Sequence, residues 1–470
     1  MELSNTRRVR GVAVRARRGS GRSASSTWAY ATADGRDPVL PHRAPAARAR
    51  KAWALVALAA TVTLLAGCGR EPVELVETRA AMTTEITVRV IAPNERTART
   101  CLESAWREME ACALRLDRWT EASDIYKINE AAGMFHVNVD PLTVSCLMAA
   151  KDAWKASGGV FDPTVGPLLT LWREAEQRNR PPTDEELAAA CRLVGMDKVE
   201  TLVGLIQKRF NDLPIVAPDD PPPDPDELQR TIYTVGVRKG MELNVGGIAK
   251  GYIAGRMARR LRLHGATAGL VAAAGDIYAF GRRPRSMVRF GRDPRWGVAV
   301  QDPRHPDDRS RRYTAVHLED QAIDTSGHYY RGYEIQGTHY SHIIDPRTGR
   351  PVDTRLASAT VVAEAPALSD GLATAMAVLG IEKGLEVVES LDGVECLLLE
   401  WKPKGGEAPT PEGAPPEDAD LVAHRSSGFA ALEFDPAHLE PETPAPEEAP
   451  ATPPPATPEP APSAGNAQGG

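Results

Sequence analysis

The sequence predicts a folded domain that contains both β-strands and α-helices, and three observations support this prediction. Apolar and polar residues alternate over Glu85–Ile91, as in a half-buried strand. Apolar residues recur at helical spacing over Thr97–Leu116. Between Met241 and Arg259 a short strand breaks at two glycines into an amphipathic helix. With 470 residues, of which 42% are hydrophobic, the chain can form two to three domains with a buried core.

Each predicted element has its own signal. The apolar stripe of the first helix consists of Ala98, Cys101, Leu102, Ala105, Trp106, Met109, Ala113 and Leu116. A second helix is predicted over Pro141–Ser157, because the glycine pair that follows is typical of a helix end. Thr183, with Glu186 three residues later, forms a capping box that begins a third helix. Strand character returns over Leu421–Phe434.

Proline-rich segments delimit the folded part. The acidic proline run within 212–227 and a similar segment at 402–420 lack the apolar residues needed to pack, so both are predicted to be surface insertions. Residues 435–470 are rich in Pro, Ala, Glu and Thr and are predicted to be a disordered tail. The folded part is therefore expected at roughly 73–434.

Residues 1–67 are predicted to be a basic leader and a lipoprotein signal peptide. A basic region ending at Lys51 precedes the apolar run 52–65, which has signal-peptide length and is too short to span a bilayer comfortably. The run ends in Leu65-Ala66-Gly67-Cys68, which resembles a bacterial lipobox with Cys68 as the lipidated new N-terminus. The alternative is a buried apolar strand with an ordinary cysteine.

The lipobox has consequences for localisation. We expect the mature protein to lie in a bacterial cell envelope, anchored by lipid and facing the periplasm or the outside of the cytoplasmic membrane. Residues 68–77 would then form a tether between the anchor and the folded domain.

Charge and cysteine content exclude two classes of function. The formal net charge is −7, and without residues 1–67 it is −16, because 44 basic and 60 acidic residues remain. An acidic protein lacks the basic footprint that a nucleic-acid partner requires. The five cysteines after Cys68 are odd in number and lack metal-ligand spacing, so neither a disulfide framework nor a zinc site is indicated.

The most informative segment is the strand, glycine turn and helix at 241–259. Gly246 and Gly247 allow a tight turn and close approach of a ligand. The free N–H groups of the first helical turn favour an anion, and Lys250 adds a positive charge in that turn. The sequence therefore predicts a phosphate or pyrophosphate site. The alternative is a plain strand–helix corner with Lys250 in solvent.

A second candidate site lies on a small, apolar helix at 367–380. Asp370 and Thr374 are four residues apart and share one face of that helix. A carboxylate that faces inward needs a partner, and Mg²⁺ is the obvious one beside a pyrophosphate. An N-cap role for Asp370 is the competing interpretation.

Three other segments have simple structural interpretations when taken singly. Asp162-Pro163-Thr164 is typical of a turn with an Asx cap, and Asp345–Gly349 is typical of a loop turn. His342 has the alternative of a buried structural histidine.

The order and spacing of these segments resemble the FAD:protein FMN transferases of the ApbE type. The resemblance covers Thr78–Phe434 and rests on nine segments in the same order. They are MTT from Met82, SDIYKIN from Ser123, FDPTVGPLLTLW from Phe161, NVGGIAKGY from Asn244, AGDI from Ala274, TSG from Thr325, HIIDPRTGRP from His342, SDGLATA from Ser369 and SGF from Ser427. The resemblance implies a two-lobed α+β fold, T-fold-like, with mixed sheets, flanking helices and an FAD cleft between the lobes.

The resemblance also implies which residues form the site. Residues near the flavin or lining the FAD site would be Met82, Trp119, Asn129, Val160, Phe161, Asp162, Gly246, Lys250, Tyr252, Asp276 and Ile344. Asp370, Thr374 and the backbone carbonyl of Ala249 would hold Mg²⁺. His342 is the first candidate for the general base, and His328 is the second.

The implied reaction is Mg²⁺-dependent transfer of FMN from FAD to a Thr or Ser hydroxyl of an exported redox protein, with release of AMP. The alternatives are an FAD pyrophosphatase that yields FMN and AMP, and a flavin-binding lipoprotein without turnover. The sequence departs from the usual family pattern at four positions. Asn244 and Gly255 each replace a usual Asp, and Thr83 and Ala274 each replace a usual Gly.

Overall fold

The computed structural model describes residues 71–82, 84–203, 233–305, 308, 310–327, 332–352, 355–402 and 420–439. Several predictions lie outside these residues. They concern the leader and Cys68, the two insertions apart from their outermost residues, the C-terminal tail beyond 439, and His328. Within the described part, every helix is too short or too polar to cross a membrane.

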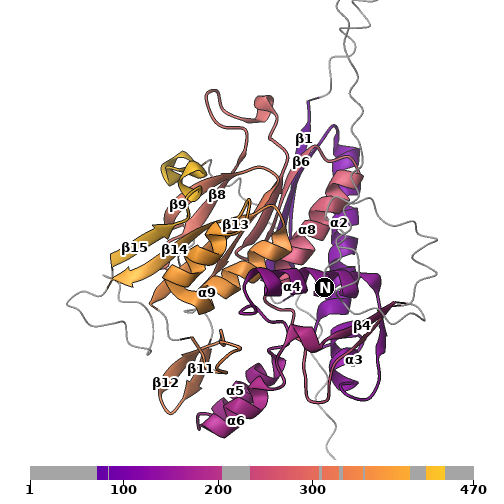
Figure 1. The fold of residues 1–470 in the computed structure, drawn as a ribbon. Coiled ribbons are helices and arrows are strands. Elements are labelled where there is room, and N and C mark those ends of the chain that lie inside the picture. Colours follow the sequence, from indigo (N-terminus) through magenta and orange to yellow (C-terminus); the bar gives the residue numbers. More distant parts are fainter. Residues whose placement is uncertain are drawn as a thin grey trace, which may run out of the picture. The chain divides into compact units, whose positions relative to one another are not determined.

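An eight-stranded sheet forms the centre of the described structure (Figure 1). Its strand order is β1-β2-β6-β7-β10-β13-β14-β15, and each neighbouring pair is antiparallel. The strands are β1 (Val73–Ala81), β2 (Thr84–Ala92), β6 (Ala268–Ala273), β7 (Asp276–Phe280), β10 (Gln321–Ser326), β13 (Leu356–Ala363), β14 (Glu395–Lys402) and β15 (Asp420–Arg425).

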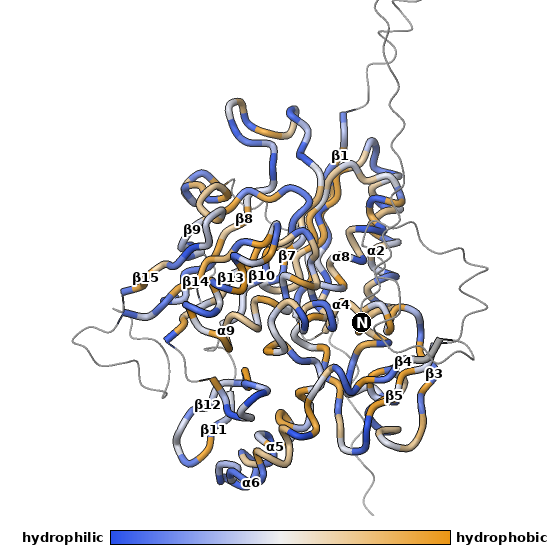
Figure 2. The backbone as a smooth tube through the Cα atoms, viewed as in Figure 1, coloured by the Kyte–Doolittle hydropathy of each residue, from blue (hydrophilic) through white to orange (hydrophobic). Residues whose placement is uncertain are grey.

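Four helices lie on one side of this sheet (Figure 1). They are α2 (Glu95–Leu116), α4 (Pro141–Ala156), α8 (Ala249–Leu263) and α9 (Pro366–Glu389). Three of them pack against its strands, and α4 packs against the other three helices. The apolar stripe predicted on α2 is buried against the sheet, apart from Ala113, which is half-buried. Figure 2 shows hydrophobic backbone segments concentrated between these helices and the strands. This layer is the main hydrophobic core.

A smaller sheet packs against part of the other face. It consists of β8 (Trp296–Gln301), β9 (Arg312–Leu318) and β16 (Glu433–Phe434), in the order β16-β9-β8. Successive residues of β10 face opposite cores, as the period of a strand requires. Ala322 packs in the helix-side core, and Ile323 packs with Trp296 and Val298 in the second core.

The remaining elements form a smaller lobe and connecting segments. Helices α5 (Gly166–Gln177) and α6 (Asp184–Cys191) pack with the hairpin β11 (Gly332–Ile335) and β12 (Thr338–Ser341) around Trp172. A further three-stranded sheet has the order β3-β5-β4. Its strands are β3 (Val137–Val139), β5 (Tyr233–Gly236) and β4 (Glu200–Val203), and α3 (Asp124–Glu130) packs beside β3. Single 3₁₀ turns are η1 (Met196–Lys198), η3 (Arg285–Met287), η5 (Phe429–Ala431) and η6 (Pro436–His438).

The α+β prediction is confirmed, and so are most of the predicted elements. The capping box at Thr183 begins α6, with both of its hydrogen bonds present. Gly158 and Gly159 follow α4 with φ of 67° and 85°, a conformation that glycine adopts readily. Helix α9 extends the predicted 367–380 segment at both ends, and Gly380 breaks its helical geometry at φ 74°.

The strand character predicted over Leu421–Phe434 is confirmed at the two ends of this segment, in β15 and β16. The chain leaves β15 after Arg425 and turns through η5 before Glu433 and Phe434 pair with β9 of the smaller sheet. Glu395 accepts the backbone N–H of Gly428 at 3.0 Å and holds this turn. The apolar residues of the segment therefore serve two sheets.

A buried ion-pair cluster joins α2 to α8. Glu108 is buried in the middle of α2 and accepts hydrogen bonds from Nε of Arg256 at 2.7 Å and from Nε of Arg260 at 2.6 Å. Burial alone would raise the pKa of Glu108, but the two arginines outweigh this effect and hold the pKa below its ordinary value. One carboxylate of α2 thus pairs with two guanidinium groups where α8 crosses α2.

We expect Glu108→Gln to lower the free energy of unfolding by about 1.5–3 kcal/mol at neutral pH, because a charge-assisted interaction is lost. A carboxyl with a lowered folded-state pKa stabilises the protein above its unfolded pKa of about 4.3, and loses this contribution as the pH falls through its folded pKa. Urea unfolding at pH 7 and pH 3 tests both expectations. The difference between wild type and variant should shrink at pH 3, and an equal difference at both pH values would contradict the ion-pair account.

Candidate active site

A single cleft of about 3010 Å³ contains most of the residues predicted for the site. Met82, Trp119, Val160, Phe161, Asp162, Gly246, Ala249, Lys250, Asp276, His342, Ile344, Asp370 and Thr374 all line it. Both lobes contribute, since α8, α9 and β7 belong to the large lobe and Ile344 belongs to the core of the small lobe. Its volume is well above the ~300–1,000 Å³ of ordinary ligand pockets.

The glycine turn at the centre of the cleft is held by two asparagine side chains. Oδ1 of Asn244 accepts the N–H of Gly246 at 2.9 Å. Asn129, 114 residues earlier, binds both backbone groups of Leu243: its Nδ2 donates to the carbonyl at 3.0 Å, and its Oδ1 accepts the N–H at 2.7 Å. Asn129 therefore lies outside the cleft lining and positions the segment that leads into the turn. The short strand predicted before the turn is wrong, because Glu242 forms only an isolated bridge with Val165.

The N-terminus of α8 receives an anion from within the protein. The N–H of Gly251, in the first turn of α8, donates to Oδ2 of Asp370 at 2.9 Å. A carboxylate at a helix N-terminus is favoured by the free N–H groups and by the helix dipole. The alternative N-cap role for Asp370 on its own helix is wrong, because α9 begins at Pro366 and its N-cap is Ala365.

Glycine is required at position 251 by close packing between α8 and α9. A Cβ there would lie 2.8 Å from Cβ of Asp370 and closer still to the carbonyl oxygen of Pro366. One turn later, a Cβ at Gly255 would lie 3.1 Å from Cγ of Pro366. Helix α8 thus approaches α9 along its small residues, which also accounts for Gly255 in place of the usual Asp.

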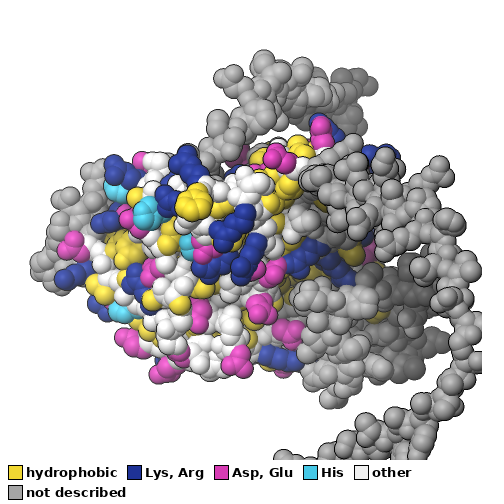
Figure 3. All heavy atoms as spheres, turned by 90° about the horizontal axis from the view of Figure 1, so that it is seen from above, with side chains coloured by type: hydrophobic (Ala, Val, Ile, Leu, Met, Phe, Trp, Pro, Cys, Tyr) yellow, Lys and Arg dark blue, Asp and Glu magenta, His cyan; other side chains and the backbone are white. Residues whose placement is uncertain are grey.

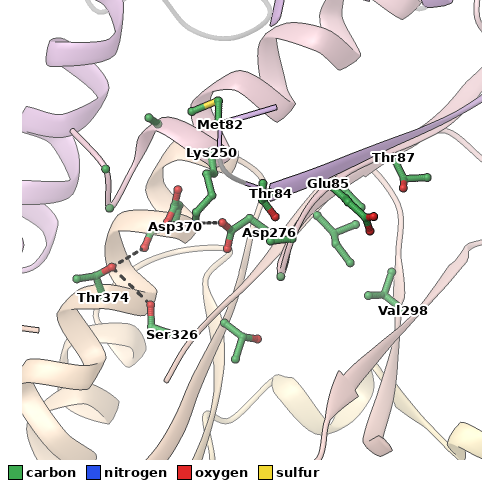
Figure 4. A pocket seen from close by; sticks show the side chains of 18 of the residues that line it. Met82, Thr84, Glu85, Thr87, Lys250, Asp276, Val298, Ser326, Asp370 and Thr374 are labelled. Atoms are coloured by element: carbon green, nitrogen blue, oxygen red, sulfur yellow. Dashed lines mark hydrogen bonds and ion pairs between the residues drawn. The ribbon is translucent and has the colours of Figure 1, made fainter. Parts of the chain in front are cut away.

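Lys250 is paired with carboxylates rather than free in solvent. Its Nζ forms an ion pair with Asp276 and lies 3.9 Å from Oδ1 of Asp370 (Figure 4). Burial opposes the charged form of Lys250, but the carboxylates outweigh burial and raise its pKa above the ordinary value. The positive charge predicted for the anion site is therefore already partly neutralised by the protein.

Asp324 is an acidic residue of the carboxylate cluster that sequence reasoning missed. It is 1% exposed, and one carboxylate oxygen each from Asp276, Asp324 and Asp370 lie within 4.8 Å of one another. Burial, followed by the charges of Asp276 and Asp370, raises the pKa of Asp324 well above its ordinary value. The available signal was an Asp at an inward-facing position of the apolar strand β10.

Asp370 and Thr374 lie together, as their spacing on one helix predicted. Oγ1 of Thr374 donates to the backbone carbonyl of Asp370 at 3.4 Å and lies 3.5 Å from Oγ of Ser326 (Figure 4). Burial raises the pKa of Asp370 to about 7, although Lys250 and the N–H of Gly251 act in the opposite direction. This end of the cleft is lined by oxygen atoms suited to a hard cation.

Two of the other predicted site residues have structural partners. Oδ1 of Asp162 accepts the backbone N–H and the hydroxyl of Thr164 at 2.8 and 2.6 Å, which confirms the Asx turn. Tyr252 lies outside the cleft lining, and its hydroxyl donates to the carbonyl of Leu142 at 3.0 Å. Burial raises the pKa of Asp162, whose Oδ2 accepts the N–H of Met196 at 3.1 Å, so both oxygen atoms of this cleft-lining residue have backbone partners.

Trp119 stands at the rim of the cleft with 62% of its surface exposed. The central guanidinium carbons of Arg118 and Arg173 lie 4.5 and 4.6 Å from its ring centroid. These cation–π contacts hold an exposed aromatic ring in place. His342 and Ile344 both line the cleft, and they directly precede the turn formed by Asp345–Gly349.

Comparison with known proteins agrees with this geometry. The model of the ApbE family matches residues 82–398. The chain belongs to the ApbE family. The FAD:protein FMN transferase of Vibrio cholerae is 31% identical over 345 residues, which cover 72% of this chain and 90% of that protein. The FAD:protein FMN transferase of Treponema pallidum is 29% identical over 301 residues, 63% of this chain and 76% of that protein.

Solved structures of ApbE proteins share the fold. The apo form of the flavinyl transferase ApbE from Pseudomonas stutzeri superimposes with a TM-score of 0.58 at 23% identity, and the match covers 77% of this chain and 97% of that one. The ApbE protein of Thermotoga maritima has a TM-score of 0.57 at 27% identity, and the match covers 77% of this chain and all of that one.

Figure 3 shows one face of the described structure, on which both basic and acidic side chains are exposed.

Ala274 occupies a position that favours glycine. It has φ of 58° in the two-residue turn between Ala273 and Asp276, which are paired across β6 and β7. Hairpin turns with a positive φ at the first central position prefer glycine there. Ala274 thus carries strain next to Asp276, the partner of Lys250.

We expect Ala274→Gly to raise the free energy of unfolding by up to about 1 kcal/mol, since the left-handed conformation costs other residues about 1–2 kcal/mol and glycine loses part of this gain in the unfolded chain. Thermal and urea unfolding measure the difference. Ala273→Gly, in the regular part of β6, is the matched control and should destabilise the protein. A less stable Ala274→Gly variant would show that the turn carries no strain.

Proposed function

We propose that this protein is a Mg²⁺-dependent FAD:protein FMN transferase that modifies a Thr or Ser hydroxyl of an exported protein and releases AMP. The observation that carries the proposal is the position of Asp370 and Thr374. Both lie beside the glycine turn, at the oxygen-lined end of the large cleft. Membership of the ApbE family and the names of its relatives support the same activity.

The oxygen atoms at this end of the cleft fit a hard divalent cation. The Asp370 carboxylate, the Thr374 hydroxyl and the Ala249 carbonyl would hold Mg²⁺, whose preferred ligands are oxygen atoms. Burial of three carboxylates against one lysine also leaves negative charge for a cation to neutralise. When bound, Mg²⁺ would neutralise charge on a pyrophosphate and make its phosphorus easier to attack.

The remaining cleft residues have roles that suit FAD and an acceptor. The exposed ring of Trp119 offers a flat surface for the flavin, and Gly246 and Gly247 allow a phosphate to approach the backbone. The cleft exceeds the size of an ordinary ligand pocket, so it has room for FAD together with a segment of the acceptor chain.

The proposed reaction joins the acceptor oxygen to the phosphorus of the FMN half of FAD. The bond from that phosphorus to the bridging oxygen breaks, and its electron pair leaves on AMP. His342, on the cleft wall, is the proposed base that takes the hydroxyl proton. A positioned base typically contributes 10²–10⁴-fold to the rate, and alignment and charge neutralisation contribute the rest.

We further propose that the enzyme acts in the bacterial cell envelope, where Cys68 is the lipidated N-terminus. Expression in a bacterium should yield a mature chain whose N-terminal peptide carries the mass of lipid on Cys68. Mass spectrometry of that peptide is the measurement. Cys68→Ser is the control and should appear without lipid; an unmodified Cys68 in the wild type would refute lipidation.

A three-way assay tests the transferase activity. Purified protein is mixed with FAD, Mg²⁺ and a Thr-containing acceptor peptide, and the expected products are a covalently flavinylated, fluorescent peptide and AMP. Free FMN without labelled peptide would indicate a pyrophosphatase, and intact FAD in a tight complex would indicate a carrier. Either of these two outcomes contradicts the proposed transferase.

Asp370→Asn should reduce transfer at saturating FAD by at least 100-fold at low Mg²⁺, because one Mg²⁺ ligand loses its charge. Added Mg²⁺ should restore part of the activity. The control is Asp302→Asn, which alters a buried carboxylate that pairs with Arg304 outside the cleft lining. An unchanged Mg²⁺ requirement in Asp370→Asn would count against the ligand assignment.

A further inference from the structure

Asp324 is buried, and no hydrogen bond of ordinary geometry reaches it from the described residues. The side chain is 1% exposed, and the hydroxyl of Ser369, which interacts with it, donates its hydrogen bond to the carbonyl of Val361 at 2.9 Å. A buried polar group without a partner costs folding free energy, and native proteins rarely retain one without a reason.

The strand register places Asp324 against a second carboxylate. Strands β7 and β10 are antiparallel and pair Ile277 with Ile323, so the next position sets Asp276 opposite Asp324. Like charges directly opposite each other on neighbouring strands are destabilising. Both side chains lie on the helix side of the sheet, where α9 adds Asp370. One oxygen atom from each of the three carboxylates lies within 4.8 Å of the other two.

Only part of this charge is neutralised within the described residues. Lys250 pairs with Asp276 and lies 3.9 Å from Asp370, whereas Asp324 has no ion-pair partner there (Figure 4). Three carboxylates therefore face one ammonium group. When all four groups are ionised, a net charge of two negative units remains, and one divalent cation would neutralise it.

We infer that Asp324 is a third carboxylate of the divalent-cation site, acting with Asp276 and Asp370. This inference rests on the cation site of the proposed function and adds a ligand group that the family resemblance does not imply. Asp324 binds the cation directly or through one of its waters, since Mg²⁺ usually keeps several waters. The negative charge of the site thus comes from β7 and β10 of the sheet as well as from α9.

The test measures cation binding in the absence of FAD and acceptor. The full chain is freed of metal with a chelator, and MgCl₂ or MnCl₂ alone is titrated by calorimetry and by thermal unfolding. Asp324→Asn should weaken binding of both cations by about 10–100-fold, the usual effect of losing such a group. Its melting temperature in chelator should equal or exceed that of the wild type, because an unpaired charge has been removed.

Matched variants make the result decisive. Asp302→Asn removes a buried carboxylate elsewhere and should leave the cation affinity unchanged. Asp324→Ser repeats the test if the Asn variant folds poorly. Cation affinity within twofold of the wild type in a folded Asp324 variant would overturn the inference.

Asp370→Asn separates this inference from the proposed function. If Asp370→Asn loses cation affinity and Asp324→Asn does not, the proposed site stands and the role of Asp324 fails. If Asp370→Asn keeps its affinity, the shared site fails and both proposals fail with it. Because neither FAD nor acceptor is present, a failure to detect flavin transfer leaves this result unaffected.

Discussion

The site depends on the close contact between Gly251 and Asp370. Because residue 251 has no side chain, α8 approaches α9 closely enough for its first-turn N–H to bind the Asp370 carboxylate at 2.9 Å. This hydrogen bond fixes Asp370 relative to the glycine turn that precedes α8, and Thr374 follows because it lies one turn further along α9. A side chain at position 251 would push the helices apart and separate the two halves of the site.

Charge buried at this contact has an energetic cost that hydrophobic residues would avoid. Buried ion pairs seldom contribute net stability, and a carboxylate without a partner is unfavourable. The protein nevertheless places Lys250, Asp276, Asp324 and Asp370 where the sheet meets two helices. The surrounding apolar core holds these groups in one arrangement, and the cleft gives a ligand access to them. Such an arrangement is typical of functional sites, where preorganised charge is worth more than local stability.

The sequence predicted features whose causes are local in the chain. The capping box of α6, the glycine pair after α4 and the shared face of Asp370 and Thr374 depend on residues within one or two turns. The family motifs predicted most of the named residues that line the cleft. Tertiary contacts were beyond local reasoning: Asn129 holds Leu243 across 114 residues, and Lys250 turns away from solvent toward Asp276. Asp324 meets Asp276 only through the register of β7 and β10, which no local pattern encodes.

The departure at Asn244 has a structural explanation. A usual Asp at this position would accept the N–H of Gly246, and the amide oxygen of Asn244 does so at 2.9 Å without a negative charge. The turn therefore keeps its shape while the charge beside it falls. The negative charge beside Lys250 comes mainly from the clustered carboxylates of Asp276, Asp324 and Asp370. Under the proposed function, a neutral turn beside these carboxylates would avoid repulsion of a phosphate at the turn, and the cation would bind where Asp370 and Thr374 meet.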